Sequence, residues 1–179
     1  MAPKSNTKIG IIGTGFIGGG LKKTIDGLDD MRVSRVLTRR DLSEFQDNGV
    51  YTNSYEELIN ESDLIVECNG DPVYVTEILN KVLTAGLPVV TMDAELHITS
   101  GSFLSTRGLI TEAEGDQPGA LAALDRDLIT MGFKPLVYGN LKGFLNLNPT
   151  REDMKYWAKK QGISLEQVTG FTDGTKVQI

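Results

Sequence analysis

The chain has 179 residues, of which 40% are hydrophobic and 23% charged. This composition excludes a disordered or fibrous protein and allows a substantial buried core. Twenty-four acidic residues against eighteen basic ones give a net charge of −6, which argues against nucleic acid or an anionic membrane as the main partner. Cys68 is the only cysteine, so an internal disulfide and a thiolate zinc site are excluded.

No apolar stretch approaches the roughly 18 residues that span a bilayer, and the first residues lack the apolar core of a signal peptide. We therefore expect a cytoplasmic protein that acts on a small molecule, and we leave open whether it forms a homo-oligomer.

Apolar runs alternate with segments of helical period along the chain, which is typical of parallel strands joined by crossover helices. Strands are expected at residues 8–12, 32–38, 50–52, 63–68, 87–92, 109–113 and 136–138. Helices are expected at residues 16–25, from 54 onward, at 72–85, at 118–131 and from 150 to near 162. A second capping box is expected at residues 164–167. The segment 94–107 shows no clear periodicity of apolar residues, and we expect it to be rich in turns.

Two helix starts carry recognisable capping patterns. Ser54 and Glu57 form a capping box, in which each side chain is expected to bond the backbone amide of the other. Asp71 followed by Pro72 begins the next helix, because Asp accepts from a free first-turn amide and Pro needs no amide partner there.

The sequence Gly13-Thr-Gly-Phe-Ile-Gly18 directly follows the first strand and opens a helix, which is the context in which GxGxxG binds a dinucleotide. Gly13 permits the tight turn, Gly15 lets a pyrophosphate approach the backbone, and Gly18 lets helix and strand pack closely. Glycines used only for packing are the alternative. Cofactor contacts are expected throughout the turn, from Gly13, Thr14, Gly15, Phe16, Ile17 and Gly18.

The end of the second strand decides which dinucleotide is bound, because an acid there holds a ribose hydroxyl and an arginine holds a 2′-phosphate. The strand ends in Thr38, Arg39 and Arg40, and the nearest carboxylate is Asp41. These residues favour NADP over NAD. A solvated strand end is the alternative interpretation.

Other strand ends bring polar side chains to the same edge of a parallel sheet. Asn69 and Gly70 are expected to line the nicotinamide ribose, and Glu95 to contact substrate. Cys68 is expected to be a packing residue. Glu95, Glu114 and Asp116 could bind a divalent metal, although clustered acids are more often caps or surface groups.

Hydride transfer to a carbonyl produces an alkoxide, which needs a proton donor or a cation. Lys142 and Lys176 are the cationic candidates, because each lies in a glycine-containing loop near the predicted site. Solvated surface charges are the alternative. His97, the only histidine, could act as a general acid, but an ordinary polar loop residue is the preferred interpretation.

Four motifs in this order resemble the homoserine-dehydrogenase-like oxidoreductases that carry a C-terminal SAF domain, a group that includes deoxyxylulose-phosphate-reductoisomerase-like enzymes. They are the glycine turn, Glu114-Gly-Asp-Gln-Pro-Gly119, Gly139-Asn-Leu-Lys-Gly143 and Phe171-Thr-Asp-Gly-Thr-Lys176. The resemblance implies an NADP-dependent reductase. Its active site would use Lys142, Lys176 and Asp116, with Gln117 and Asn140 beside the substrate.

We therefore predict a doubly wound parallel α/β sheet of the Rossmann type over residues 1–140. The beginning of a substrate-binding or dimerisation region would follow over 141–179, within a longer protein. The expected function is NADPH-dependent reduction of a small polar or phosphorylated carbonyl compound, with or without isomerisation. A homoserine-type dehydrogenase and a non-catalytic, redox-sensing NADP-binding module are the alternatives, because fold membership does not fix the substrate.

Overall fold

The computed structural model describes residues 6–46, 49–113, 119–139, 146, 148–161 and 164–172. The chain forms two compact units, Met1–Ala120 and Leu121–Ile179. This division falls before residue 140, where the sequence predicts the end of the dinucleotide-binding domain, and that functional boundary stays a prediction.

The first unit contains a six-stranded parallel sheet in the order β3-β2-β1-β4-β5-β6. This is the order of a doubly wound Rossmann sheet, in which the strand order reverses between β1 and β4. The predicted fold class is therefore confirmed, as are six of the seven predicted strands. The strands are β1 (Thr7–Ile12), β2 (Met31–Leu37), β3 (Tyr51–Thr52), β4 (Leu64–Glu67), β5 (Val89–Thr91) and β6 (Ile110–Glu112).

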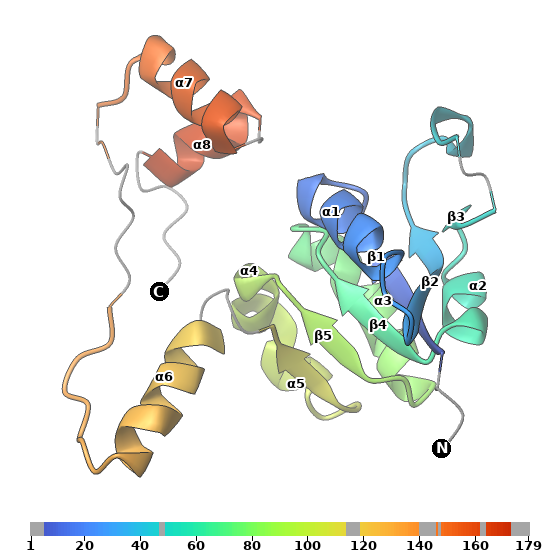
Figure 1. The fold of residues 1–179 in the computed structure, drawn as a ribbon, viewed down its shortest axis with the longest axis horizontal. Helices are drawn as coiled ribbons and strands as arrows, with labels where there is room; N and C mark the ends of the chain where they lie inside the picture. The colour runs from blue at the N-terminus through green and yellow to red at the C-terminus, as the bar shows by residue number, and fades with distance from the viewer. Residues whose placement is uncertain are drawn as a thin grey trace. The chain divides into compact units, whose positions relative to one another are not determined.

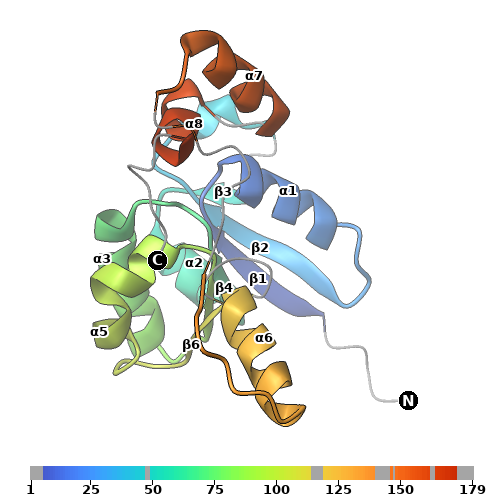
Figure 2. The ribbon, with the colours of Figure 1, turned by 90° about the vertical axis from the view of Figure 1, so that its left-hand side faces the viewer.

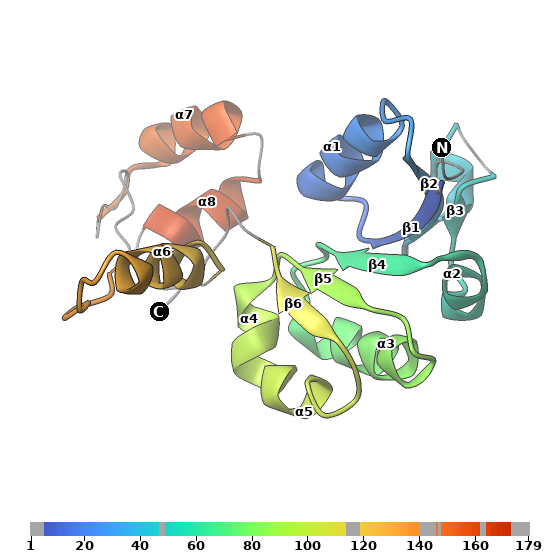
Figure 3. The same ribbon diagram turned by 60° about the horizontal axis from the view of Figure 1, so that its bottom comes forward.

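Helices cover both faces of this sheet (Figures 1 and 3). On one face, α1 (Phe16–Ile25) buries Ile25 among Ile9, Ile11 and Val33. The other face carries α2 (Tyr55–Glu61), α3 (Pro72–Thr84), α4 (Ala94–Leu96) and α5 (Ser102–Leu104). Their apolar side chains pack on inward-facing residues such as Ile12 and Ile65. The strand ends that carry the predicted site residues therefore lie on a rigid scaffold.

The segment after β5 corrects one prediction. Residues 94–104, expected to be turns, are helical: α4 continues through a π-helical turn, His97–Gly101, into α5. Asp93 caps this segment, since its Oδ1 accepts the amide of Leu96 at 3.3 Å. Leu96 and Leu104 are fully buried on the sheet. Burial of these leucines therefore outweighs the weak helix propensity of the Thr, Ser and Gly residues between them.

The capping pattern at α2 forms in a different way from the one expected. Ser54 Oγ accepts the amide of Glu57 at 3.2 Å, as predicted. The amide of Ser54, however, donates to Thr52 Oγ1 at 3.0 Å, and the Glu57 carboxylate accepts from the same hydroxyl at 2.7 Å. The hydroxyl of Thr52, the last residue of β3, thus bridges the Ser54 amide and the Glu57 carboxylate, which were expected to bond directly. The predicted start of α3 is confirmed, because Asp71 Oδ1 accepts the amide of Tyr74 at 3.1 Å.

The second unit contains α7 (Arg151–Gln161) and α8 (Leu165–Thr172), which lie side by side (Figure 2). Their contact buries Met154 and Val168. Helix α6 (Gly119–Thr130) forms where the sequence predicts a helix. The strand predicted at 136–138 does not form. The side chains of Leu136 and Val137 are 85% and 87% exposed, so burial does not favour a strand there.

In the part of the chain that the structure describes, no helix combines the length and the apolar character that a membrane span requires.

Candidate functional site

The turn between β1 and α1 depends on two glycines. Gly13 has a φ of +118°, which side chains disfavour, and a Cβ there would lie 2.9 Å from the carbonyl oxygen of Cys68. A Cβ on Gly18 would lie only 2.2 Å from the carbonyl oxygen of Gly13 and 3.3 Å from the Cys68 sulfur. The first turn of α1 therefore packs directly on its own entry loop and on the loop after β4.

Gly15 has a different role, because the space beside its Cα is open. It is the N-cap of α1, and a Cβ added there would meet no atom within 4 Å. The first-turn amides of a helix have no partner within the helix. Here no side chain caps them, and the first turn of α1 contains no acidic residue. The turn thus offers free amides and the positive end of a helix dipole to an anion.

Thr38, Arg39 and Arg40 are held next to this turn by well-defined hydrogen bonds. Thr38 Oγ1 lies 3.3 Å from Thr14 Oγ1 and accepts the amide of Arg40 at 3.2 Å. The side-chain amide of Asn53 donates to the carbonyl oxygens of Thr38 and Arg40, at 2.6 Å and 3.1 Å. The two predicted threonine positions therefore come together. Asn53, which the sequence analysis did not single out, fixes the loop.

The two arginines point to different carboxylates. Arg39 lies 3.0 Å from Asp71 Oδ2 and stacks over the Tyr74 ring at 4.2 Å. Arg40 Nε donates to Glu44 at 2.9 Å. Both arginine side chains are 55% exposed, and ion pairs this exposed contribute only about 0–1 kcal/mol. Each guanidinium can therefore exchange its carboxylate for a phosphate at little cost.

Asp41 is occupied elsewhere. Its carboxylate caps the 3₁₀ turn Leu42–Glu44 by accepting the amide of Ser43 at 2.9 Å. The same hydrogen bond lowers the pKa of Asp41. This local role leaves the ribose-recognition position at the end of β2 to the basic residues.

The loop after β4 forms the opposite side of the turn. The Cys68 thiol donates to the carbonyl oxygen of Ile12 at 3.4 Å. Burial, together with the charge of Glu67, raises the pKa of this thiol to about 12. Cys68 is therefore a packing residue, as expected, because its reactive thiolate form is absent at neutral pH. Asn69 and Gly70 follow it, and Gly70 has a φ of +74°.

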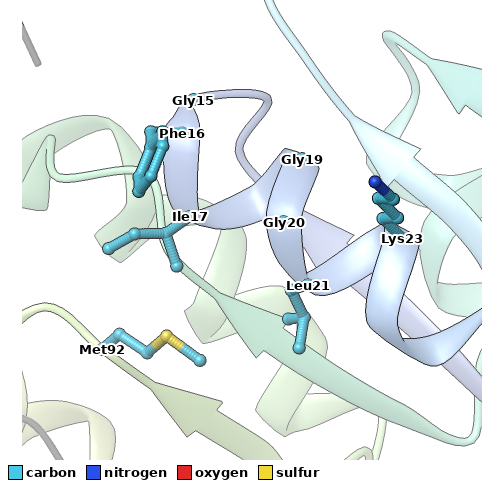
Figure 4. A pocket seen from close by; sticks show the side chains of 8 residues that line it. All are labelled: Gly15, Phe16, Ile17, Gly19, Gly20, Leu21, Lys23 and Met92. Carbon is cyan, nitrogen blue, oxygen red and sulfur yellow. The ribbon is translucent and has the colours of Figure 1, made fainter. Parts of the chain in front are cut away.

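An open cavity of about 620 Å³ lies between α1 and the end of β5 (Figure 4). Phe16 and Ile17, which the sequence assigns to cofactor binding, are 71% and 50% exposed and line it. The side chains of Ile17 and Leu21 extend from α1 in the direction of Met92. Met92, Gly19 and Gly20 also line the cavity, although none of them is among the site residues predicted from the sequence. The lining residues are Gly15, Phe16, Ile17, Gly19, Gly20, Leu21, Lys23 and Met92.

Carboxylates gather at the ends of β4 and β5. Glu67 and Asp93 are buried, and Glu95 is half-buried in α4. Burial raises the pKa of Asp93 to about 7, with further contributions from Glu67 and Glu95. Within the described ranges, no three His, Cys, Asp or Glu side chains are placed to hold a metal ion.

The raised pKa of Asp93 makes stability depend on pH. The folded chain keeps this proton up to about pH 7, whereas an unfolded Asp loses it near pH 3.8. The free energy of unfolding therefore falls as pH rises between these values, by at most about 1.4 kcal/mol per pH unit. Asp93→Asn keeps the capping oxygen and removes the charge. We therefore expect the free energy of unfolding of Asp93→Asn to exceed that of wild type by an amount that grows from pH 4 to pH 7. Urea unfolding at several pH values measures this difference.

The matched control is Asp30→Asn, which removes an exposed carboxylate just before β2. Its stability relative to wild type is expected to vary little over the same range. An equal gain for Asp93→Asn at both ends of the range would contradict the assignment.

His97 lies in a helix and contacts Glu112 at the end of β6 through Nε2, so the expectation of a loop residue is wrong. Burial lowers the pKa of His97. Six other predicted residues lie outside the described residues, and their roles stay predictions. They are Glu114, Asp116, Gln117, Asn140, Lys142 and Lys176.

A family model for the NAD-binding domain of homoserine dehydrogenase matches residues 13–106, more than half of the chain. The chain belongs to this family. The model of the catalytic domain of the oxidoreductase DRL matches residues 115–179. The resemblance to homoserine-dehydrogenase-like oxidoreductases is thereby confirmed, and the glycine turn belongs to a domain that binds a nicotinamide cofactor. No curated protein matches the chain.

Solved structures share the fold. A homoserine dehydrogenase from Thiobacillus denitrificans is 19% identical, with a TM-score of 0.57 over 70% of this chain and 34% of its own. The apo scyllo-inositol dehydrogenase from Lactobacillus casei is 13% identical, with a TM-score of 0.52 over 72% of this chain and 43% of its own. The chain therefore spans less than half the length of either protein.

Proposed function

We propose that this chain binds NADPH and supplies the cofactor half of a reductase that acts on a small polar or phosphorylated carbonyl compound, with or without isomerisation. One observation carries the proposal. The uncapped N-terminus of α1, open at Gly15, lies beside two exposed arginines at the end of β2. The first feature suits a diphosphate, and the second suits the additional 2′-phosphate that distinguishes NADP from NAD.

Each part of the cofactor would have a group of described residues at this edge of the sheet. Amides at the start of α1 would hold the diphosphate, and Thr38, Arg39 and Arg40 would hold the 2′-phosphate. Asn69 and Gly70 would contact the nicotinamide ribose. When bound, NADPH would supply a hydride. The open space at Gly15, which a Cβ would fill, supports this fit.

The chain's other predicted residues would act on the substrate. Lys142 and Lys176 would stabilise or protonate the oxygen on which negative charge develops. Asp116 and Gln117 would orient the substrate, with Glu95 and Asn140 beside it. This assignment is tested by a screen in which the full-length protein is mixed with NADPH and small polar or phosphorylated carbonyl compounds. Turnover is measured as the loss of the absorbance of reduced nicotinamide.

Two other results would favour other functions. Oxidation of homoserine with NADP would indicate a homoserine-type dehydrogenase, which the family match favours as the second candidate. Tight NADPH binding without turnover of any compound would indicate a non-catalytic binding module.

The two arginines predict the choice of cofactor. Replacing both Arg39 and Arg40 by Ala is expected to weaken NADPH binding by about 10- to 100-fold, the effect of losing one or two charge-assisted hydrogen bonds. NADH binding is expected to change little, because NADH lacks the 2′-phosphate. Isothermal titration calorimetry with both dinucleotides measures the difference.

Arg32→Ala is the matched control, since Arg32 is exposed at the opposite end of the same strand. It loses the same kind of charge away from the site, and NADPH affinity should stay at the wild-type value. Equal weakening of NADPH and NADH in the double variant would contradict the assigned recognition of the 2′-phosphate.

A further inference from the structure

Glu67 is a carboxylate in a place where an apolar residue would be expected. It is the last residue of β4, after Leu64, Ile65 and Val66, and its exposed fraction is 0%. A buried carboxylate destabilises a protein unless hydrogen bonds compensate it. Burial also raises the pKa of Glu67. The bonds that this side chain makes therefore indicate why it is present.

Its two oxygens bond to the loop after β4 and to the residue just before the loop after β5. Oε1 accepts the backbone amide of Asn69 at 2.6 Å, in the loop after β4. Oε2 accepts the hydroxyl of Thr91, at the end of β5, at 2.6 Å. The backbone carbonyl of Glu67 also accepts the amide of Met92 at 2.9 Å. Glu67 thus connects the loop after β4 to the end of β5.

The first of these loops supports the glycine turn. A Cβ on Gly13 would lie 3.2 Å from Asn69 Cα, as well as 2.9 Å from the Cys68 carbonyl oxygen. The Cys68 amide donates to the carbonyl oxygen of Ile12 at 3.0 Å. The loop after β4 therefore lies directly against the glycine turn.

The second connection reaches the start of α4. Thr91 Oγ1, while donating to Glu67, accepts the amide of Asp93 at 3.0 Å. Asp93 in turn caps α4 through the amide of Leu96. Met92, which lines the cavity beside α1, lies between these two bonded residues. One continuous hydrogen-bond network therefore fixes the loops after β4 and β5.

We infer that Glu67 is a positioning residue for the nicotinamide half of the bound dinucleotide, acting through the backbone of Asn69 and through Thr91 beside Met92. The inference rests on the proposed function. Arg39 and Arg40, which would hold the adenosine half, lie on the loop after β2 and bond to Asp71 and Glu44, whereas Glu67 bonds to Asn69 and Thr91. Loss of Glu67 should therefore affect the two halves of the ligand unequally.

Two ligands and two variants test this inference by calorimetry on the whole chain. NADPH contains both halves, whereas adenosine 2′,5′-bisphosphate lacks the nicotinamide half. Glu67→Leu removes both bonds and is expected to weaken NADPH about tenfold while changing the affinity for the bisphosphate less than about twofold. Glu67→Gln keeps an oxygen that accepts the Asn69 amide, and its NH2 group can donate to Thr91 Oγ1, which reverses the direction of the wild-type bond but retains the connection. It should therefore restore most of the NADPH affinity.

Other outcomes separate the possible failures. Equal weakening of both ligands by Glu67→Leu would show a merely structural role, and unchanged NADPH affinity would likewise overturn the inference. If Glu67→Leu does not fold, Thr91→Val is the second variant: it removes the Oε2 bond and the bond that Thr91 accepts from the Asp93 amide, and leaves the Asn69 bond in place. It must show the same selective loss of NADPH for the inference to stand. A wild-type chain that binds neither ligand would instead refute the proposed function, and the inference with it.

Discussion

Replacing Gly18 by Ala is expected to destabilise the first unit and to abolish NADPH binding. The added Cβ would lie 2.2 Å from the carbonyl oxygen of Gly13 and 3.0 Å from its carbonyl carbon. Both are backbone atoms of the tight turn, so α1 must move away from β1. Overpacking of this kind costs about 1–3 kcal/mol, and contact with backbone favours the upper end of that range. Urea unfolding and calorimetry with NADPH measure the two effects.

Gly20→Ala provides the matched control on the same helix. A Cβ there would meet no atom within 4 Å, and Ala favours a helix interior over Gly by about 1 kcal/mol. This variant should be as stable as wild type or more stable. A Gly18→Ala protein with the stability of wild type would show that α1 does not pack on the turn in this way.

Gly15→Ala is expected to show a different pattern, in which stability is kept and binding is lost. The φ of Gly15 is −72°, which Ala adopts without strain, and its Cβ would meet nothing in the described structure. The unfolding free energy should therefore change by less than about 1 kcal/mol. The methyl group would occupy the space through which a diphosphate reaches the amides of α1, so NADPH affinity should fall by roughly 10- to 100-fold.

Comparing this variant with Gly18→Ala separates folding from recognition. Circular dichroism should give a thermal unfolding curve for Gly15→Ala close to that of wild type, while calorimetry shows weak NADPH binding. Wild-type affinity in Gly15→Ala would mean that the diphosphate does not approach the helix at this residue.

The sheet was predictable because its strands carry strong local signals. Runs such as Ile9-Gly-Ile-Ile12 are buried on both faces of a parallel sheet, and glycine or capping residues mark the connections. The turn at Gly13 was equally predictable, since each glycine has a role that the spacing alone specifies. These features depend on residues close together in the sequence.

Other features depend on tertiary contacts, which the sequence does not show. Leu136, Val137 and Tyr138 have high strand propensity, yet their exposed side chains form no strand. The helical segment after β5 contains residues typical of turns and forms because Leu96 and Leu104 are buried on the sheet. The pairing of Arg39 with Asp71 and the bond between Glu67 and Thr91 join residues far apart in the sequence, so no local pattern reveals them.

The most direct measurement is a titration of the isotopically labelled chain with NADPH, followed by amide NMR spectra. If the start of α1 holds the diphosphate, the amide signals of Phe16, Ile17 and Gly18 should shift strongly and saturate together with those of Arg39 and Arg40. NADPH binding that leaves the amide signals of α1 unchanged would contradict the assignment of this turn as the dinucleotide site.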